Sequence, residues 1–274
     1  MNATKISTET LHEIIGISTE ALPYFNHKNH DEIIHFVFCA LEKINKSTQG
    51  IARLYSALDG NDDLEFPIGI LLRSLMMDNL MIQNIKHKIF TQIQENSKIE
   101  KLALKKIIQG VCYKFLSDGT DNLIKGLKLS DNLTPSEKEA AAKRFANVFP
   151  KAFDLSAGMP KLKANFKFRL KELYLNSKHE SLVSLDSTYN LYTFYSKYDH
   201  LSHWTSLAKR IPFEQRKGKV DLAIVIVLMQ LRDVLVLAYD FDPDYTVLEP
   251  LLEQIQQHLR KEYDPEIYQS TIST

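Results

Sequence analysis

The sequence predicts an all-α fold, a multi-helix bundle of roughly eight to ten helices. Apolar residues recur with the 3.6-residue period of a helix over several long segments. Glycine and proline are few, at nine each in 274 residues, and they fall between those segments. No stretch shows the alternation typical of strands, and no unit repeats at a fixed period. We therefore expect a single helical domain over residues 1–274, in which 117–180 forms a more polar insertion or lid.

Four periodic segments predict the helices of the N-terminal half. They span residues 8–22, 31–58 and 67–95, with a fourth from the Asn96-Ser97 cap to about residue 116. Pro23 ends the first segment, and Asp59-Gly60-Asn61-Asp62 is a strong stop after the second. Pro67 suits the first turn of the third helix, because a proline there loses no helical hydrogen bond.

The C-terminal half begins with a less regular stretch, Ser117 to Asn132. Thr134-Pro135-Ser136-Glu137 then has the pattern of a capping box and predicts a helix ending near Pro150. After a loop at 154–161, the remaining predicted helices span 161–176, 187–204, 220–240 and 245–262. The run Leu222–Met229 is too short to cross a bilayer, so we expect a core helix there.

The composition limits which binding partners and which cellular compartment we expect for this protein. Lys and Arg total 34 and Asp and Glu total 34, so the formal net charge is zero and no strong overall field would attract nucleic acid. The N-terminal residues lack the basic and apolar regions of a signal peptide. Cys39 and Cys112 lie among apolar residues, which predicts two buried, reduced thiols. We expect a soluble, cytoplasmic protein with no membrane segment.

Two segments carry the chemistry of a candidate site. Arg73 lies in an otherwise apolar helix, and a guanidinium keeps its charge on burial, so it must face solvent or find polar partners. Tyr192, Ser196 and His200 are four residues apart and share one face of a later helix. If the two helices converge, they form a polar pocket that binds a ligand or holds a structural network.

These segments resemble one family, a widespread group of bacterial all-helical proteins without an assigned activity. The first element is Arg73-Ser74-Leu75 and the second is Tyr192-x-x-Tyr195-Ser196-x-x-x-His200, in the order and separation of that family. The resemblance covers roughly residues 31–240 and implies a helical fold. The family's acidic residue follows the arginine by four positions; Met77 stands there in this chain, and Asp78 is rotated by about 100° around the helix.

The predicted site follows from these two elements. Arg73 and His200 are the candidate catalytic residues. The candidate ligand-binding residues are Asp78, Tyr192, Tyr195, Ser196, Ser202 and His203. The leading hypothesis is a binding or interaction module with a polar pocket between the helices. The alternative is a metal-independent ribonuclease of a helical toxin or phage-defence type, in which Arg73 and His200 stabilise charge and transfer protons.

The other chemical alternatives are weaker. His200 and His203 share a helix face, but no third ligand follows at a suitable spacing, and His30 or His35 would have to approach through the fold. No metal or cofactor is predicted, because the common phosphate-binding, dinucleotide-binding, hydrolase and zinc-protease motifs are absent from the sequence. The basic connector 209–219 is expected to be a solvated linker, with phosphate binding as its alternative. The partner stays open between a small ligand and a protein, and an oligomer is also compatible.

Overall fold

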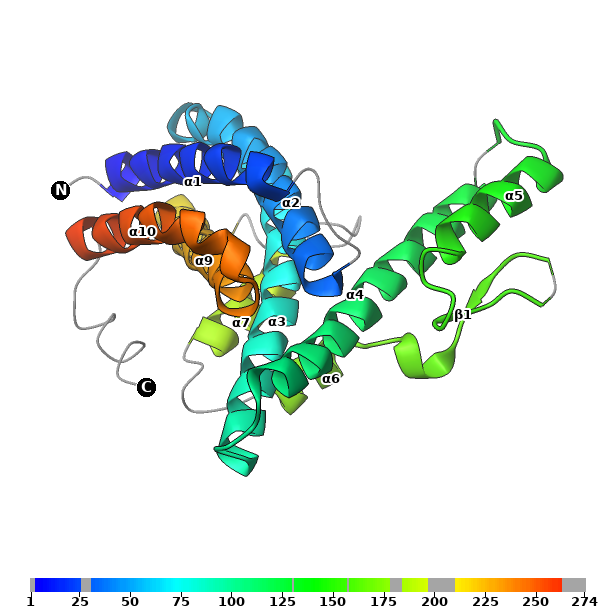
Figure 1. Ribbon diagram of the computed structural model, residues 1–274. Helices are drawn as coiled ribbons and strands as arrows, with labels where there is room; N and C mark the ends of the chain where they lie inside the picture. Colours follow the sequence, from blue (N-terminus) through cyan, green and yellow to red (C-terminus); the bar gives the residue numbers. More distant parts are fainter. Residues whose placement is uncertain are drawn as a thin grey trace.

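The chain folds into an all-α bundle, as the sequence predicts. The computed structural model describes residues 3–25, 31–129, 131–156, 158–177, 184–196 and 210–262. Within these ranges it contains nine α-helices, four short 3₁₀ segments and one two-stranded antiparallel pair (Figure 1). No helix in the described ranges has both the length and the apolar character needed to cross a bilayer.

Five long helices form the main core, with one further helix against it. Their bounds are α1 (Ala3–Phe25), α2 (Glu32–Tyr55), α3 (Glu65–Glu95), α9 (Phe213–Phe241), α10 (Glu249–Glu262) and the shorter α7 (Ser184–Tyr195). The central helix is α9, which packs on each of the other five. Its apolar run explains this position, since side chains all around the helix are buried. The predicted core helix is confirmed and begins earlier, at Phe213.

A second, smaller core lies on an arm that extends from the bundle. The arm consists of the far half of α4 (Lys101–Leu129), α5 (Pro135–Ala146) and the paired strands β1 (Phe153–Asp154) and β2 (Lys161–Leu162) (Figure 1). The predicted capping box opens α5: Thr134 accepts from the backbone N–H of Glu137, and the Glu137 carboxylate accepts from that of Thr134. Residues between α4 and α7 therefore pack partly on themselves and partly on α3.

Two predicted helix boundaries in this arm are wrong. Helix α4 does not end near residue 116 but continues through Gly119 and Gly126 to Leu129. Tertiary packing overrides the low helix propensity of glycine there, because Ile124 is buried beneath α5. The predicted helix 161–176 is also wrong for its first part, since Leu162 joins the small core as part of β2. Helix returns only in α6 (Leu170–Asn176).

The basic connector is not a solvated linker. Arg216 and Lys217 lie in the first turn of α9, and their side chains are only 4% and 9% exposed. Arg216 pairs with Glu65 and, at 3.1 Å, with Asp62, whereas Lys217 pairs with Asp59. Asp59 and Asp62 belong to the turn that the sequence marks as a stop after α2, and Glu65 is the first residue of α3. Acids of the chain itself therefore neutralise Arg216 and Lys217, so these two cations are not available to a phosphate.

Candidate functional site

The structure brings Arg73 and Tyr192 together at the contact of α3 with α7. The Arg73 guanidinium carbon lies 5.6 Å from the centre of the Tyr192 ring, which is cation–π distance. Six residues along α3, the Asn79 amide donates to the Thr188 hydroxyl at 3.0 Å. From the first contact to the second, the residue number increases along α3 and decreases along α7, so the two helices are antiparallel. The two predicted segments are therefore neighbours in the fold.

Tyr195 and Ser196 are occupied in other ways. Tyr195 is fully buried and stacks edge-on against Phe194, with 5.2 Å between ring centres. The Ser196 hydroxyl donates to the Thr193 carbonyl oxygen of its own helix at 2.8 Å. Tyr195 thus belongs to the main core, and the Ser196 hydroxyl is bonded within its own helix. His200, Ser202 and His203 lie outside the described residues, so the ribonuclease alternative stays a prediction.

Asp78 belongs to a different contact. Its carboxylate pairs with Lys43 of α2 at 2.7 Å, on another face of α3 from Arg73. Burial raises the pKa of Asp78, and the positive charge of Lys43 opposes this rise. The one-residue displacement noted in the sequence therefore has a structural consequence, since Asp78 serves α2. In the part of the chain that the structure describes, no three His, Cys, Asp or Glu side chains form a group that could hold a metal.

A buried charge network joins α3 to α9. Asp233 is 7% exposed and accepts from Lys86 at 2.9 Å, from Arg232 at 2.9 Å and from Gln83 at 3.3 Å. Burial would raise the pKa of the Asp233 carboxyl, but the charges of Lys86 and Arg232 outweigh it and hold the pKa low. Sequence reasoning did not select Asp233, although an acid within the apolar α9 run is a visible signal. All its partners are protein groups, so the network is structural.

A groove of about 430 Å³ lies between α3, α4 and the segment 167–176. Its α4 wall consists of Ile107, Gly110, Val111, Lys114 and Phe115, which recur at helical spacing and so share one face. Asn84 and Lys88, four residues apart, form the α3 wall. A volume of this size is within the range of small-ligand sites, which is about 300–1,000 Å³.

Three contacts hold the third wall in place. Ser177, just after α6, accepts from the Asn84 amide of α3 at 2.7 Å. Tyr174 of α6 stacks flat on Tyr189 of α7, with 4.1 Å between ring centres. The ring of Phe168 packs edge-to-face on Phe115 of α4, at 5.3 Å. The segment 167–176 is therefore fixed to three helices, and the groove is preformed.

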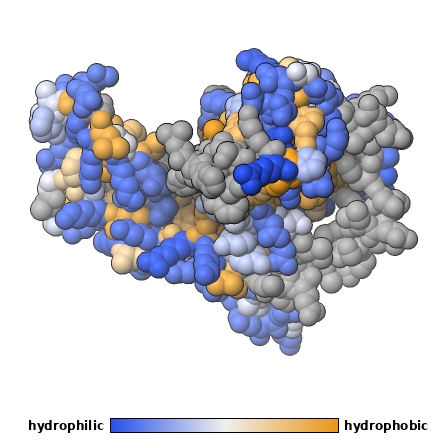
Figure 2. Space-filling model, turned by 180° about the vertical axis from the view of Figure 1, so that it is seen from behind, coloured by the Kyte–Doolittle hydropathy of each residue, from blue (hydrophilic) through white to orange (hydrophobic). Residues whose placement is uncertain are grey.

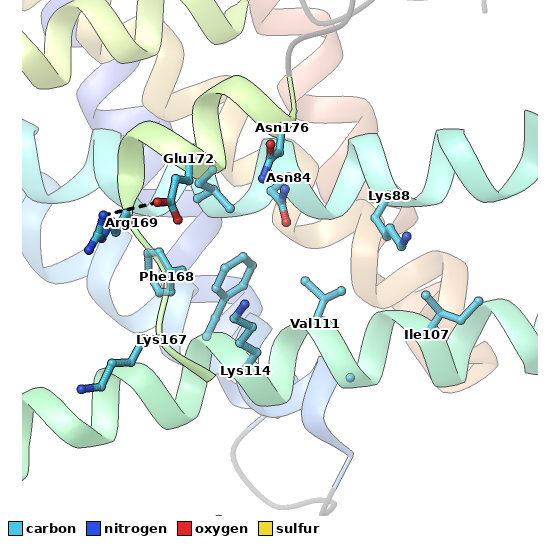
Figure 3. A pocket seen from close by; sticks show the side chains of 13 residues that line it. Asn84, Lys88, Ile107, Val111, Lys114, Lys167, Phe168, Arg169, Glu172 and Asn176 are labelled. Atoms are coloured by element: carbon cyan, nitrogen blue, oxygen red, sulfur yellow. Dashed lines mark ion pairs between the residues drawn. The ribbon is translucent and has the colours of Figure 1, made fainter. Parts of the chain in front are cut away.

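Basic side chains dominate the polar lining of this groove. Lys88, Lys114, Lys167 and Arg169 line it, together with a single acid, Glu172. Glu172 pairs with Arg169 at 3.6 Å, and both side chains are exposed (Figure 3). Within the described ranges, no carboxylate lies within ion-pair distance of the ammonium groups of Lys88, Lys114 or Lys167. The groove therefore has an excess of positive charge in a chain with no net charge.

One acid modifies this charge at the α4 wall. Asp118, one turn after Lys114, interacts with the backbone N–H of Phe168 and with the Lys114 charge. Burial raises the pKa of Asp118, and the nearby Asp121 raises it further. Asp118 thus places a negative charge near Lys114 on the α4 wall, without forming an ion pair with it.

Comparison with protein families, curated proteins and solved structures finds no match to this chain. The function must therefore be argued from the groove itself. Sequence reasoning missed all four of its cations, because they come from three separate segments and no spacing within one segment joins them. The sequence signal that does exist is local: Lys167-Phe168-Arg169 places an aromatic residue between two cations.

Proposed function

We propose that this protein is a binding module, which takes an anionic ligand into the basic groove between α3, α4 and the segment 167–176. The observation that supports this most directly is the unpaired state of Lys88 and Lys114, which extend into the gap from opposite helices (Figure 3). By contrast, Lys86 and Arg216, which lie at other helix contacts of the described fold, pair with carboxylates. An anion in the groove would fill the same role for Lys88 and Lys114.

The apolar part of the lining supports a bound molecule rather than loosely held counterions. Ile107, Val111 and Phe168 contribute carbon surface between the cations. A ligand with both charged and apolar parts would use both kinds of wall, as is usual in small-molecule sites. We keep the cytoplasm as the proposed setting, because Cys39 is a free, exposed thiol, contrary to the burial expected for it.

Charge reversal in the groove tests this proposal. The probe is inorganic tripolyphosphate, and its binding is measured by isothermal titration calorimetry. Lys114→Glu should weaken binding about tenfold or more, since a hydrogen bond to a charged group contributes about 1.5–3 kcal/mol. Lys46→Glu is the matched control: it makes the same change in net charge on an exposed part of α2, where the lysine pairs only with Glu42. Equal weakening in both variants, or no binding by the parent protein, would overturn the proposal.

A further inference from the structure

The segment Lys167-Phe168-Arg169 alternates cation, aromatic ring and cation on an extended backbone. Lys167 has φ −74° and ψ 148°, and Arg169 has φ −119° and ψ 131°. In extended chain, successive side chains point to opposite sides, so the two cations share one side and the ring takes the other. Figure 3 shows Lys167 and Arg169 extending the same way, away from the gap between α3 and α4, and Phe168 is among the residues that line the groove. The segment therefore offers its ring surface to the groove and carries two exposed cations on its outer side, at the end of the groove.

The cations are spread along the groove rather than gathered at one point. Lys88 lies toward one end, Lys167 and Arg169 lie at the other, and Lys114 extends from α4 between them (Figure 3). A single phosphate would require donors that converge on one small anion. Cations in a row suit a ligand whose negative charges repeat along its length, such as a phosphodiester chain.

Phe168 adds the second element of such a site. Its ring lines the groove and is half-buried, and its contact with Phe115 has an interplanar angle of 81°. A T-shaped contact leaves at least one face of each ring uncovered by the other ring. Nucleic-acid bases stack on such faces, provided that they are not already stacked and paired in a duplex. Nearby, the Asn84 amide nitrogen donates to Ser177, which leaves its carbonyl oxygen as an acceptor for a base edge.

We propose that the ligand of the basic groove is a single-stranded nucleic acid, with phosphates on Lys88, Lys114, Lys167 and Arg169 and one base stacked on Phe168. This inference rests on the proposed function, because it names the ligand class of the same groove. The neutral overall charge is consistent with it, since a local row of cations supplies the contacts. Ordinary duplex would present phosphates but no free base face, and inorganic polyphosphate would present charge alone.

The experiment compares three anions on the whole chain. Fluorescence anisotropy follows a labelled dodecathymidylate or dodecauridylate, and unlabelled duplex DNA and inorganic polyphosphate compete at equal phosphate concentration. We expect the single strand to bind about tenfold or more tightly than polyphosphate, because stacking contributes about 1–3 kcal/mol per base. Phe168→Leu should remove that advantage and leave polyphosphate binding unchanged, whereas Phe168→Tyr, which keeps the ring, should retain it. Far-ultraviolet circular dichroism verifies that both variants are folded.

Salt dependence gives an independent measure of the phosphate contacts. For single strands the slope of log K against log salt is about −0.7 per phosphate contact, so Lys88→Gln should make the slope shallower by about 0.7. The two proposals fail in different ways. If no anion binds in a Lys114-dependent manner, both fail. If polyphosphate, duplex and single strand bind alike and Phe168→Leu changes nothing, anion binding stands and the nucleic-acid ligand is overturned.

Discussion

Lys86 and Lys88 lie two residues apart on α3 and have opposite surroundings. Two residues correspond to about 200° around a helix, so the two side chains leave α3 on nearly opposite sides. Lys86 points to α9, where Asp233 accepts from it at 2.9 Å in a buried network. Lys88 faces the groove between α3 and α4, where no carboxylate of the described residues lies within ion-pair distance of it.

The cations on the α9 side of α3 hold the fold together, whereas those on the groove side are available to a ligand. On the α9 side, Lys86, Arg232 and Gln83 all converge on one carboxylate, so burial is compensated within the chain. On the groove side, Lys88 and Lys114 line a cavity from two different helices and form no ion pair within the described ranges. Figure 2, seen from behind, shows hydrophilic and hydrophobic residues interspersed over the coloured part of the surface. Pairing, rather than residue type, distinguishes the two sides.

The largest expected loss of folding stability comes from removing the carboxylate of Asp233, which is the acceptor of the buried network. Asp233→Ala leaves Lys86, Arg232 and Gln83 around a site without a carboxylate, and breaking a buried pair in this way costs about 3–5 kcal/mol. Urea unfolding followed by circular dichroism measures the loss. Glu172→Gln is the control in the groove, where the pair with Arg169 is exposed and contributes less than about 1 kcal/mol. Similar losses in the two variants would contradict the distinction between the two sides.

The next largest change in stability is expected from substituting the two lysines, Lys86 and Lys88. Lys86→Ala should lower the free energy of unfolding by about 1.5–3 kcal/mol, because a charged hydrogen bond to buried Asp233 is lost. Lys88→Ala should change it by no more than about 0.5 kcal/mol, as for an ordinary surface substitution. Anion binding should show the opposite order, with Lys88→Ala weakening tripolyphosphate binding and Lys86→Ala leaving it unchanged. A destabilising Lys88→Ala would mean that the groove side also holds the fold together.

A smaller effect, on the pH dependence of stability, is expected from Asp78, which lies on the α2 side of α3. Burial raises the pKa of Asp78 in the folded protein, against the charge of Lys43, so the folded state retains this proton to higher pH than the unfolded chain. Stability therefore falls as pH rises from the unfolded pKa, about 3.9, through the folded pKa. The slope contributed by this single proton is at most about 1.4 kcal/mol per pH unit. In urea titrations between pH 3.5 and 7, the stability of Asp78→Asn relative to the parent should therefore rise with pH, and a difference that does not change with pH would contradict the assignment.

The smallest effect concerns the contact that the sequence suggested first. Tyr192→Leu should cost about 0.5–1 kcal/mol from the cation–π contact with Arg73, in addition to lost ring packing. Arg73→Met removes the same cation, so in the Tyr192→Leu background it should have a smaller effect than in the parent. The double-mutant cycle isolates this coupling. Tyr192→Phe keeps the ring and should retain the coupling, whereas a coupling of zero in the cycle would remove Arg73 from the α3–α7 contact.

Several features were accessible from sequence because each depends on neighbouring residues. Helical periodicity, the capping box at Thr134 and the apolar run of α9 predict elements that the structure confirms. The end of α4 and the strand at Leu162 were not accessible in this way, since both depend on burial beneath α5 and against Phe153. The meeting of Arg73 and Tyr192 was expected from chemistry, because a charged group in an apolar helix needs a partner.

By itself, the sequence determined the helical class, the stop between α2 and α3 and the need of Arg73 for a partner. Local propensity and periodicity suffice for these features, because they act within a few turns of chain. The tertiary structure decided which charges are neutralised. Arg216 and Lys217 form ion pairs with acids some 150 residues away, whereas Lys88 and Lys114 form no ion pair in the described fold. Charge pairing depends on which helix faces pack together, and only the folded chain determines this.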